Sequence, residues 1–338
     1  MAGDNRTDRT GPFDPEERAE EDLWFLPAED GDVPPALAWT GGQDAAAPAW
    51  RAAEAALAAD LAELGFEAGR LAERLRLAGP GAVRRLALAE AAAFSWWTGD
   101  RVTADRLALW LSYRIGAVGE GGDGLIRTAW AARRLMAPRR PGGDLAVALT
   151  DALGDEGFDP RLAGEAATAL QGVELLSPAT RGCAAFHLWR SLADRPAHLG
   201  GLEAAVLGAR LSAPGKLPFL PLSLTGFAGL TTTGAADRRL AGWISGAHRA
   251  TLSALMILDR LAAWRARAET ATADLQGRTP ARLIAALAAH PALAAAQAEA
   301  ETGASRAAVQ RNLDRLFARG LVREITGQGR FRVWAAAL

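Results

Sequence analysis

From Trp50 onward, apolar residues recur at steps of three and four along most of the chain. This spacing places them on one face of an α-helix, so the pattern predicts a mainly helical protein. The longest predicted helix has an apolar stripe from Leu240 to Leu261, with arginines on its other faces. Glycine, proline or a capping residue such as Thr103 bounds most of the predicted helices, which cover about 50–78, 82–97, 104–115, 125–137, 144–153, 160–172, 178–193, 199–212 and 237–273.

The chain breaks at residues 277–280, which read Gly-Arg-Thr-Pro, and three short helices are predicted beyond this point. Thr279 is suited to cap the first helix and Pro280 to occupy its first position, because an amide hydrogen is not needed there. The second helix is expected over about 292–301, and Ser305 is expected to cap the third. The third helix carries four apolar residues that are predicted to face inward: Val309, Leu313, Leu316 and Phe317.

Residues 321–334 carry the one convincing hairpin pattern, two short runs around a glycine-flanked turn. Three helices followed directly by such a hairpin are the plan of a winged helix-turn-helix. Side chains alternate between the faces of a strand, and a bulge would shift this alternation by one residue. The predicted faces are Ile325, Phe331 and Val333 toward the helices, and Arg330, Arg332 and Trp334 away from them. We expect both aromatic residues to serve in packing.

The predicted fold class is therefore mainly α, with a multi-helical N-terminal domain and a C-terminal winged helix-turn-helix that contains one β-hairpin. We place the helical domain at residues 46–273 and the winged helix at residues 278–338. Residues 1–45 are acidic at first and then rich in proline and glycine, so we expect them to be mostly disordered.

Charge is distributed unevenly along the chain. Residues 1–30 hold ten acids and three arginines, a net charge of −7, whereas residues 277–338 hold nine arginines and four acids, a net charge of +5. The formal net charge of the whole chain is only −1. A basic module at one end indicates an anionic partner, and for a winged helix that partner is double-stranded DNA.

Several classes of site and location are disfavoured. Cys183 is the single cysteine, and none of the four histidines is spaced from another by three or four residues, so we expect no metal site and no cofactor. No apolar run approaches the length of a membrane span, and the acidic N-terminus lacks a signal core. We expect a cytoplasmic protein that does not contact a membrane.

A recognition helix enters the major groove with its N-terminal half, which suggests roles for the outward side chains of the third helix. Ser305 and Arg306 can reach phosphates or base edges, while Gln310 and Arg311 have the donor geometry that reads adenine or guanine. Asp314 is unfavourable near phosphate, and we expect it to pair with Arg311 or Arg315. The wing should contribute phosphate contacts close to its turn. The predicted DNA-binding residues are Ser305, Arg306, Gln310, Arg311, Arg315, Arg330 and Arg332.

The chain from about Leu23 onward resembles a little-studied family from alphaproteobacteria, rhizobial species in particular. The ending RE-x-TG-x-GR-x-R-x-W carries most of this resemblance, and residues 87–111 and the segment LDRLAAWR at 258–265 support it. Members of that family join a helical domain of unknown function to a C-terminal helix-turn-helix DNA-binding domain. The resemblance therefore implies the same arrangement and a role in DNA binding.

The helical body also resembles, more remotely, the Fic proteins, which transfer AMP to hydroxyl groups. Residues 90–103 look like the Fic N-terminal helix, but Thr98 stands where the inhibitory glutamate of that family would be. His198 and the glycines after it look like the start of the catalytic motif, yet the acidic, asparagine and arginine positions are lacking. Glu203 could take the metal-binding role only across a gap. Since phosphoryl-type transfer depends on positioning and electrostatics, the resemblance implies a Fic-like scaffold that is no longer an enzyme.

We therefore expect a DNA-binding transcriptional regulator that forms a homodimer through its helical domain, with the 237–273 helix as the dimer element. The same body could sense an unknown effector or hold a protein partner. Two alternatives stay open: a diverged Fic-like nucleotidyl transferase that uses His198, and a protein-interaction module of a toxin–antitoxin or plasmid system.

Overall fold

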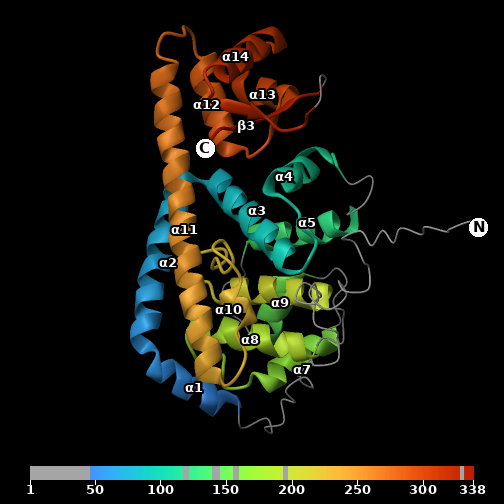
Figure 1. Ribbon diagram of the computed structural model, residues 1–338, viewed down its shortest axis with the longest axis vertical. Helices are drawn as coiled ribbons and strands as arrows, with labels where there is room; N and C mark the ends of the chain where they lie inside the picture. The colour runs from blue at the N-terminus through green and yellow to red at the C-terminus, as the bar shows by residue number, and fades with distance from the viewer. Residues whose placement is uncertain (1–45, 117–121, 139–144, 155–159, 193–196, 328–330) are drawn as a thin grey trace, which may run out of the picture. The chain divides into compact units, whose positions relative to one another are not determined.

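A computed structural model describes residues 46–116, 122–138, 145–154, 160–192, 197–327 and 331–338. Helices make up most of this part of the chain (Figure 1). The mainly α fold class is thus confirmed. The helices before the C-terminal module are α1 Ala46–Ala56, α2 Ala58–Ala78, α3 Pro80–Trp97, α4 Ala104–Tyr113, α5 Gly122–Met136, α6 Leu145–Leu153, α7 Pro160–Ala169, α8 Pro178–Leu192, α9 Ala197–Leu211, α10 Ala228–Thr231 and α11 Ala236–Ala271.

The helix predicted over 50–78 is divided into α1 and α2 at Leu57, whose backbone leaves the helical region. Thr103 caps α4 as expected, because its side chain accepts a hydrogen bond from the amide of Arg106. Helix α11 is the longest, and α2 lies alongside it (Figure 1). The apolar stripe from Leu240 to Leu261 is buried in these contacts.

The core of the helical body is closely packed around large aromatic rings. Trp243 on α11 is fully buried, and its ring lies 5.2 Å from that of Phe186 on α8. Gly208 on α9 permits this approach, since a Cβ atom there would come within 2.6 Å of the Trp243 ring. Such a contact is too short for any side chain, so the glycine sets the distance between α9 and α11.

The C-terminal module contains α12 Thr279–Ala289, β1 Leu293–Ala294, α13 Ala295–Thr302, α14 Arg306–Ala318, β2 Val322–Glu324 and β3 Val333–Ala336. The strands form an antiparallel sheet in the order β1-β3-β2. Strand β1 was not predicted; it occupies residues expected to begin the second helix. The wing is therefore the outer part of a three-stranded sheet rather than an isolated hairpin.

The start of α12 also differs from the expectation. The helix begins at Thr279, its N-cap is Arg278, and Pro280 is its second residue. The N-cap makes no side-chain hydrogen bond. Thr279 is already helical, so it cannot act as the cap.

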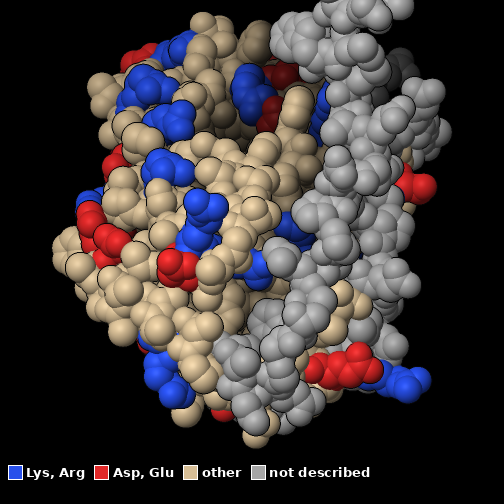
Figure 2. All heavy atoms as spheres, turned by 60° about the horizontal axis from the view of Figure 1, so that its bottom comes forward, with Lys and Arg blue, Asp and Glu red and all other residues tan. Residues whose placement is uncertain are grey.

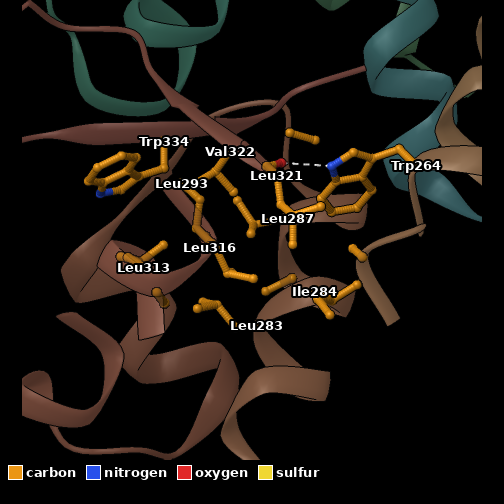
Figure 3. Packing of buried hydrophobic residues seen from close by; sticks show 14 of the residues in the cluster. Trp264, Leu283, Ile284, Leu287, Leu293, Leu313, Leu316, Leu321, Val322 and Trp334 are labelled. Atoms are coloured by element: carbon orange, nitrogen blue, oxygen red, sulfur yellow. Dashed lines mark hydrogen bonds between the residues drawn. The ribbon is translucent and has the colours of Figure 1, made fainter. Parts of the chain in front are cut away.

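The hydrophobic core of the winged helix is shared with the end of α11 (Figure 3). Trp264 and Ala268 of α11 are fully buried against Leu283 and Leu287 of α12. The indole nitrogen of Trp264 also donates a 2.7 Å hydrogen bond to the carbonyl oxygen of Leu321, which lies at the base of the wing. The last turns of α11 are therefore part of the structure that holds the winged helix.

The faces predicted for the second wing strand are wrong. Trp334 and Ala336 belong to the winged-helix core, whereas Val333 is buried outside that cluster. Phe331 is 81% exposed, and its backbone has a φ of +59°, which takes it out of the regular strand. The alternation read from the sequence assumed continuous extended backbone, and it fails at this left-handed residue. The packing role expected of Trp334 is confirmed, and that of Phe331 is not.

Candidate nucleic-acid interface

The orientation of α14 is determined by its cap and its buried face. The Ser305 hydroxyl accepts a hydrogen bond from the amide of Ala308, which confirms the predicted cap. Gly303 has the left-handed backbone (φ +64°) that ends α13 and allows the tight turn. Val309, Leu313 and Leu316 are buried as predicted. With this face buried, the remaining positions of α14 are directed outward.

Phe317 does not join the buried face of α14, although the pattern predicted that it would. Its side chain is 53% exposed, and its ring packs edge-on against Trp334 at 5.5 Å. Asn312 takes an inward position instead; it is nearly buried and donates to the carbonyl oxygen of Ala308. The periodicity identified the helix correctly but misplaced the edge of its apolar face.

The predicted recognition residues share the outer side of α14. Ser305, Arg306, Arg311 and Arg315 are exposed, and Gln310 is half-buried. Within the described part of the chain, Arg306 and Arg311 form no hydrogen bond or ion pair. Arg315 lies near Asp274, whose pKa is lowered mainly by its hydrogen bond with Arg319 and to a smaller extent by Arg315. Two guanidinium groups of α14 are thus directed to solvent without an internal partner.

Asp314 links the helix to the wing, which the sequence did not predict. Its carboxylate accepts a 2.9 Å hydrogen bond from the Gln310 amide and lies 3.6 Å from the Arg332 guanidinium. Within the described part of the chain it pairs with neither Arg311 nor Arg315, so the expectation for this residue was wrong. Arg332 also lies over the Trp334 ring, 5.0 Å from its centroid. These contacts hold Arg332 beside α14.

Arg330, the predicted phosphate contact of the wing, lies outside the described residues. The turn before it begins at Glu324, whose carboxylate accepts hydrogen bonds from the amides of Thr326 and Gly327. The pKa of Glu324 is lowered, because these hydrogen bonds and that of the Thr326 hydroxyl outweigh the opposing effect of burial. An ionised Glu324 therefore shapes the first half of the turn.

Arginine side chains make hydrogen bonds between the C-terminal module and the helical body. Arg323 at the base of the wing makes two hydrogen bonds, of 2.6 and 2.8 Å, to the carboxylate of Asp105 on α4. Arg85 on α3 donates to the carbonyl oxygens of Leu287, Ala288 and His290, where α12 ends. Burial, together with the charges of Arg323 and Arg84, lowers the pKa of Arg85 to about 10.

These connecting residues were not predicted from the sequence, because each pairs with a partner about two hundred positions away. No local motif marks Arg85 as a helix C-cap for α12 or Asp105 as an acceptor for the wing. The one sequence signal was the general enrichment of arginine in a chain with a single lysine.

The structure describes only part of the segments that resemble a Fic site. His198 lies at the start of α9, and its side chain is outside what the structure describes. Glu203 accepts a 3.1 Å hydrogen bond from the indole of Trp189. Among the described residues there is no group of three or more histidine, cysteine, aspartate or glutamate side chains placed to hold a metal ion. No described helix is both long enough and apolar enough to cross a membrane.

Comparison with known proteins bears on the C-terminal module. No curated protein matches the chain. Residues 274–330 match the model for the MarR family, and this segment runs from the residues just before α12 into the wing. The match covers the helix-turn-helix and leaves the helical body unassigned. At the family level, this similarity supports a helix-turn-helix of the kind found in DNA-binding transcriptional regulators.

Proposed function

We propose that the protein is a transcriptional regulator that reads double-stranded DNA with α14 and the wing. The observation that supports this most directly is the pair Arg306 and Arg311, which project from the outer side of α14 without a partner in the described structure. Arginine donates two parallel hydrogen bonds to guanine in the major groove, which makes such a residue suited to base recognition. A protein with this role acts in the cytoplasm, where bacterial DNA is accessible.

The proposed roles differ between residues. Arg311 and Gln310 lie within the helix half that enters a major groove, so we assign them base contacts. We assign phosphate contacts to Ser305 and Arg306 at the start of the helix. Arg315, which lies one turn beyond Arg311, is assigned the same role. Arg332 and Arg330 are assigned to the sugar-phosphate edge beside the wing, Arg330 by its sequence position alone.

The outward arginines of α14 can be compared with the charged residues on another part of the surface. On the face seen in Figure 2, basic and acidic side chains lie interspersed among uncharged residues. A mixed surface of this kind attracts polyanions weakly, because opposite charges cancel within a Debye length. Arg51 on α1 is exposed in the body and provides a matched control for loss of one arginine.

Electrophoretic mobility shifts with duplex fragments from the gene's own upstream region test the proposal. Arg311→Ala should weaken binding to the preferred sequence by ~5–100-fold and relax the preference at one position, as expected for loss of a base contact. Arg330→Ala should weaken binding to all sequences alike and reduce the dependence of log K on log salt by about one unit. Arg51→Ala should match the wild type. Equal binding by all four proteins at low salt would refute the proposal.

We further propose that two copies associate through the surface formed by α2 and α11. Phe66, Leu252 and Met256 are 67%, 37% and 57% exposed there, although large apolar side chains are usually covered. A dimer places two recognition helices on one DNA site and so doubles the sequence that is read. Met256→Glu should shift the protein toward monomer in sedimentation equilibrium. Leu175→Glu should not, because Leu175 is exposed but lies outside α2 and α11. An unchanged mass for Met256→Glu would contradict this surface.

A further inference from the structure

A cavity of about 500 Å³ lies where α3, α4 and α5 face the α12–β1 connection and α13. This volume is within the range of small-molecule sites. Its apolar wall consists of Leu88, Leu111, Met136 and Pro291. The cavity is therefore built jointly by the helical body and by the winged helix, and most of its wall comes from helices outside the segment that matches the MarR family.

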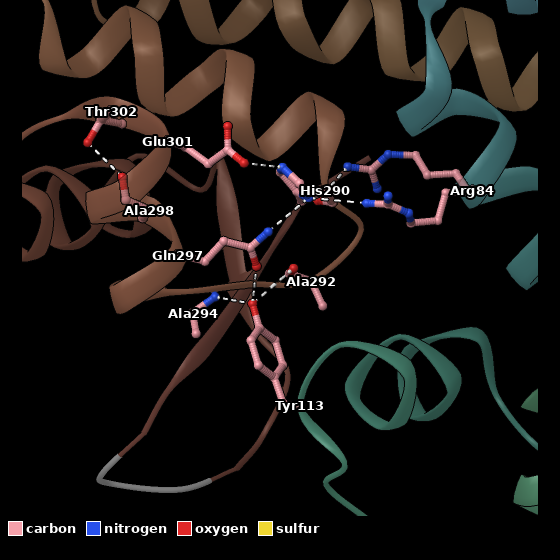
Figure 4. A network of polar contacts seen from close by, with 10 residues as sticks. Arg84, Tyr113, His290, Ala292, Ala294, Gln297, Ala298, Glu301 and Thr302 are labelled. Atoms are coloured by element: carbon pink, nitrogen blue, oxygen red, sulfur yellow. Dashed lines mark hydrogen bonds and ion pairs between the residues drawn. The ribbon is translucent and has the colours of Figure 1, made fainter.

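One side of the cavity is a connected set of hydrogen bonds centred on His290 (Figure 4). The Nδ1 atom of His290 lies 3.2 Å from the Arg84 guanidinium and 3.0 Å from the amide nitrogen of Gln297. Both neighbours are donors, so Nδ1 is the acceptor and Nε2 carries the ring proton. That Nε2–H group donates to the Glu301 carboxylate at 2.9 Å.

The same network fixes the orientation of Gln297. Its carbonyl oxygen accepts a 2.6 Å hydrogen bond from the hydroxyl of Tyr113 on α4. The Tyr113 oxygen in turn accepts from the amide of Ala294 in β1, at 2.7 Å. With its oxygen held this way, the Gln297 amide nitrogen must face His290 and the cavity. The polar side of the cavity therefore presents donors.

The charged groups at the cavity are of one sign. Arg84 is half-buried, and Arg133 is exposed and makes no hydrogen bond or ion pair with the residues that the structure describes. None of the lining residues that the structure describes is an aspartate or a glutamate. The Glu301 carboxylate lies on the far side of the His290 ring, bonded to Nε2. Two guanidinium groups therefore border an apolar space whose described lining contains no acid.

We propose that this cavity binds a small organic carboxylate with an apolar body. The carboxylate lies between Arg133 and Arg84, and the apolar body packs against Leu88, Leu111 and Met136. Charge-assisted hydrogen bonds to arginine are about twice as strong as neutral ones, and the apolar wall provides the remaining affinity through burial. A neutral molecule of the same shape lacks the first contribution and binds more weakly. This inference does not depend on DNA binding.

Isothermal titration calorimetry of the full chain, without DNA, tests the site with two probes. 1-Naphthoate has a flat apolar body and octanoate a linear one, so the better binder reports the shape that the cavity accepts. We expect at least one probe to bind with a Kd below 1 mM, on the order of the affinity that small ligands of this size reach. Methyl 1-naphthoate, the uncharged analogue, should bind at least about 5-fold more weakly than 1-naphthoate, because one charge-assisted contact is lost.

Three variants locate the binding. Arg133→Gln removes a charge that makes no described internal contact, and it should weaken binding by about 10-fold, the usual scale for one charged hydrogen bond. Ser112→Trp places a large ring at an exposed position of the cavity lining and should abolish binding. Arg51→Gln on α1 should leave binding unchanged. Thermal unfolding of each variant shows whether it remains folded.

Absence of binding by both carboxylates at millimolar concentration overturns the proposal. So does binding that Arg133→Gln and Ser112→Trp leave intact in folded protein. Equal affinity for the acid and its ester overturns the assignment of an anion. Since no DNA is present, failure here leaves the proposed regulator function untouched, and failure of the mobility shifts leaves this site untouched.

Discussion

Glu90 on α3 offers a quantitative test of how the helical body is held together. Its carboxylate is fully buried, and Oε1 accepts hydrogen bonds from the amides of Leu222 and Ser223, at 2.7 and 2.9 Å, and from the Ser223 hydroxyl at 3.1 Å. Oε2 has no partner in the described structure. Burial raises the pKa of Glu90 to about 7, although the three hydrogen bonds act in the opposite direction.

The sign of the effect on stability follows from the direction of this shift. An unfolded glutamate has a pKa of about 4.5, so between about pH 4.5 and pH 7 the folded state binds more protons than the unfolded state. Stability therefore falls as pH rises through this window, and it stops falling once the folded carboxyl has ionised. A rise of the pKa from 4.5 to about 7 corresponds to about 3 kcal/mol of unfolding free energy lost across the window.

Glu90→Gln should remove this pH dependence. The glutamine carbonyl can keep the three hydrogen bonds, and its amide occupies the place of the protonated Oε2, so the variant imitates the neutral carboxyl at every pH. We expect the two proteins to differ by less than about 1 kcal/mol at pH 5 and the variant to be more stable by about 2–3 kcal/mol at pH 8. Urea unfolding followed by tryptophan fluorescence at pH 5, 6, 7 and 8 measures the difference.

Glu165→Gln is the control, because Glu165 is exposed on α7 and makes no side-chain hydrogen bond or ion pair with the described residues. Its stability curve should run parallel to that of the wild type. If the curve of Glu90→Gln is also parallel, Glu90 ionises in the folded protein as it does in the unfolded chain, and the reasoning from burial is refuted.

Further predictions concern close packing and the wing. Gly81→Ala should lower the unfolding free energy by about 1–3 kcal/mol in urea titrations, since its Cβ would lie 2.3 Å from the carbonyl oxygen of Ala289. Gly65→Ala should instead raise it by roughly 0.5–1 kcal/mol, because nothing lies within 4 Å of the new methyl group and the helix gains from alanine. Trp334→Ala should lower the unfolding free energy by about 3–5 kcal/mol, and Phe331→Ser by less than about 0.5 kcal/mol. Thermal and urea unfolding can compare the two variants. The reverse order would support the alternation predicted from the sequence.

The part of the candidate interface on α14 was predicted well from the sequence, and the part on the wing was predicted poorly. Ser305 was identified as a cap from residue type and position, and the outward placement of Arg306 and Arg311 followed from the apolar spacing behind it. The partners of Asp314 were not predicted, because Arg332 reaches it from the wing, a separate segment of the chain. Whether these side chains contact DNA stays a prediction.

The sequence by itself determined the helical composition, most helix boundaries and the winged-helix plan. These features depend on residues within one or two turns of each other: apolar spacing reports which face is buried, and caps and glycines act on the adjacent backbone. Such signals can be read without knowledge of the fold. The ends of the long helix α11 and of α14, the third helix of the module, were both predicted to within two residues.

Only the tertiary structure decided how the winged helix is attached and what lies beside it. The two-residue strand β1, the entry of Trp264 into the winged-helix core and the cavity at His290 all join segments far apart in the chain. Both faces of β3 are buried, and which of them meets the winged-helix core was likewise decided by its neighbours, once Phe331 adopted a left-handed backbone. Periodicity states that a face is covered, and the identity of the covering element depends on long-range packing that no local pattern encodes.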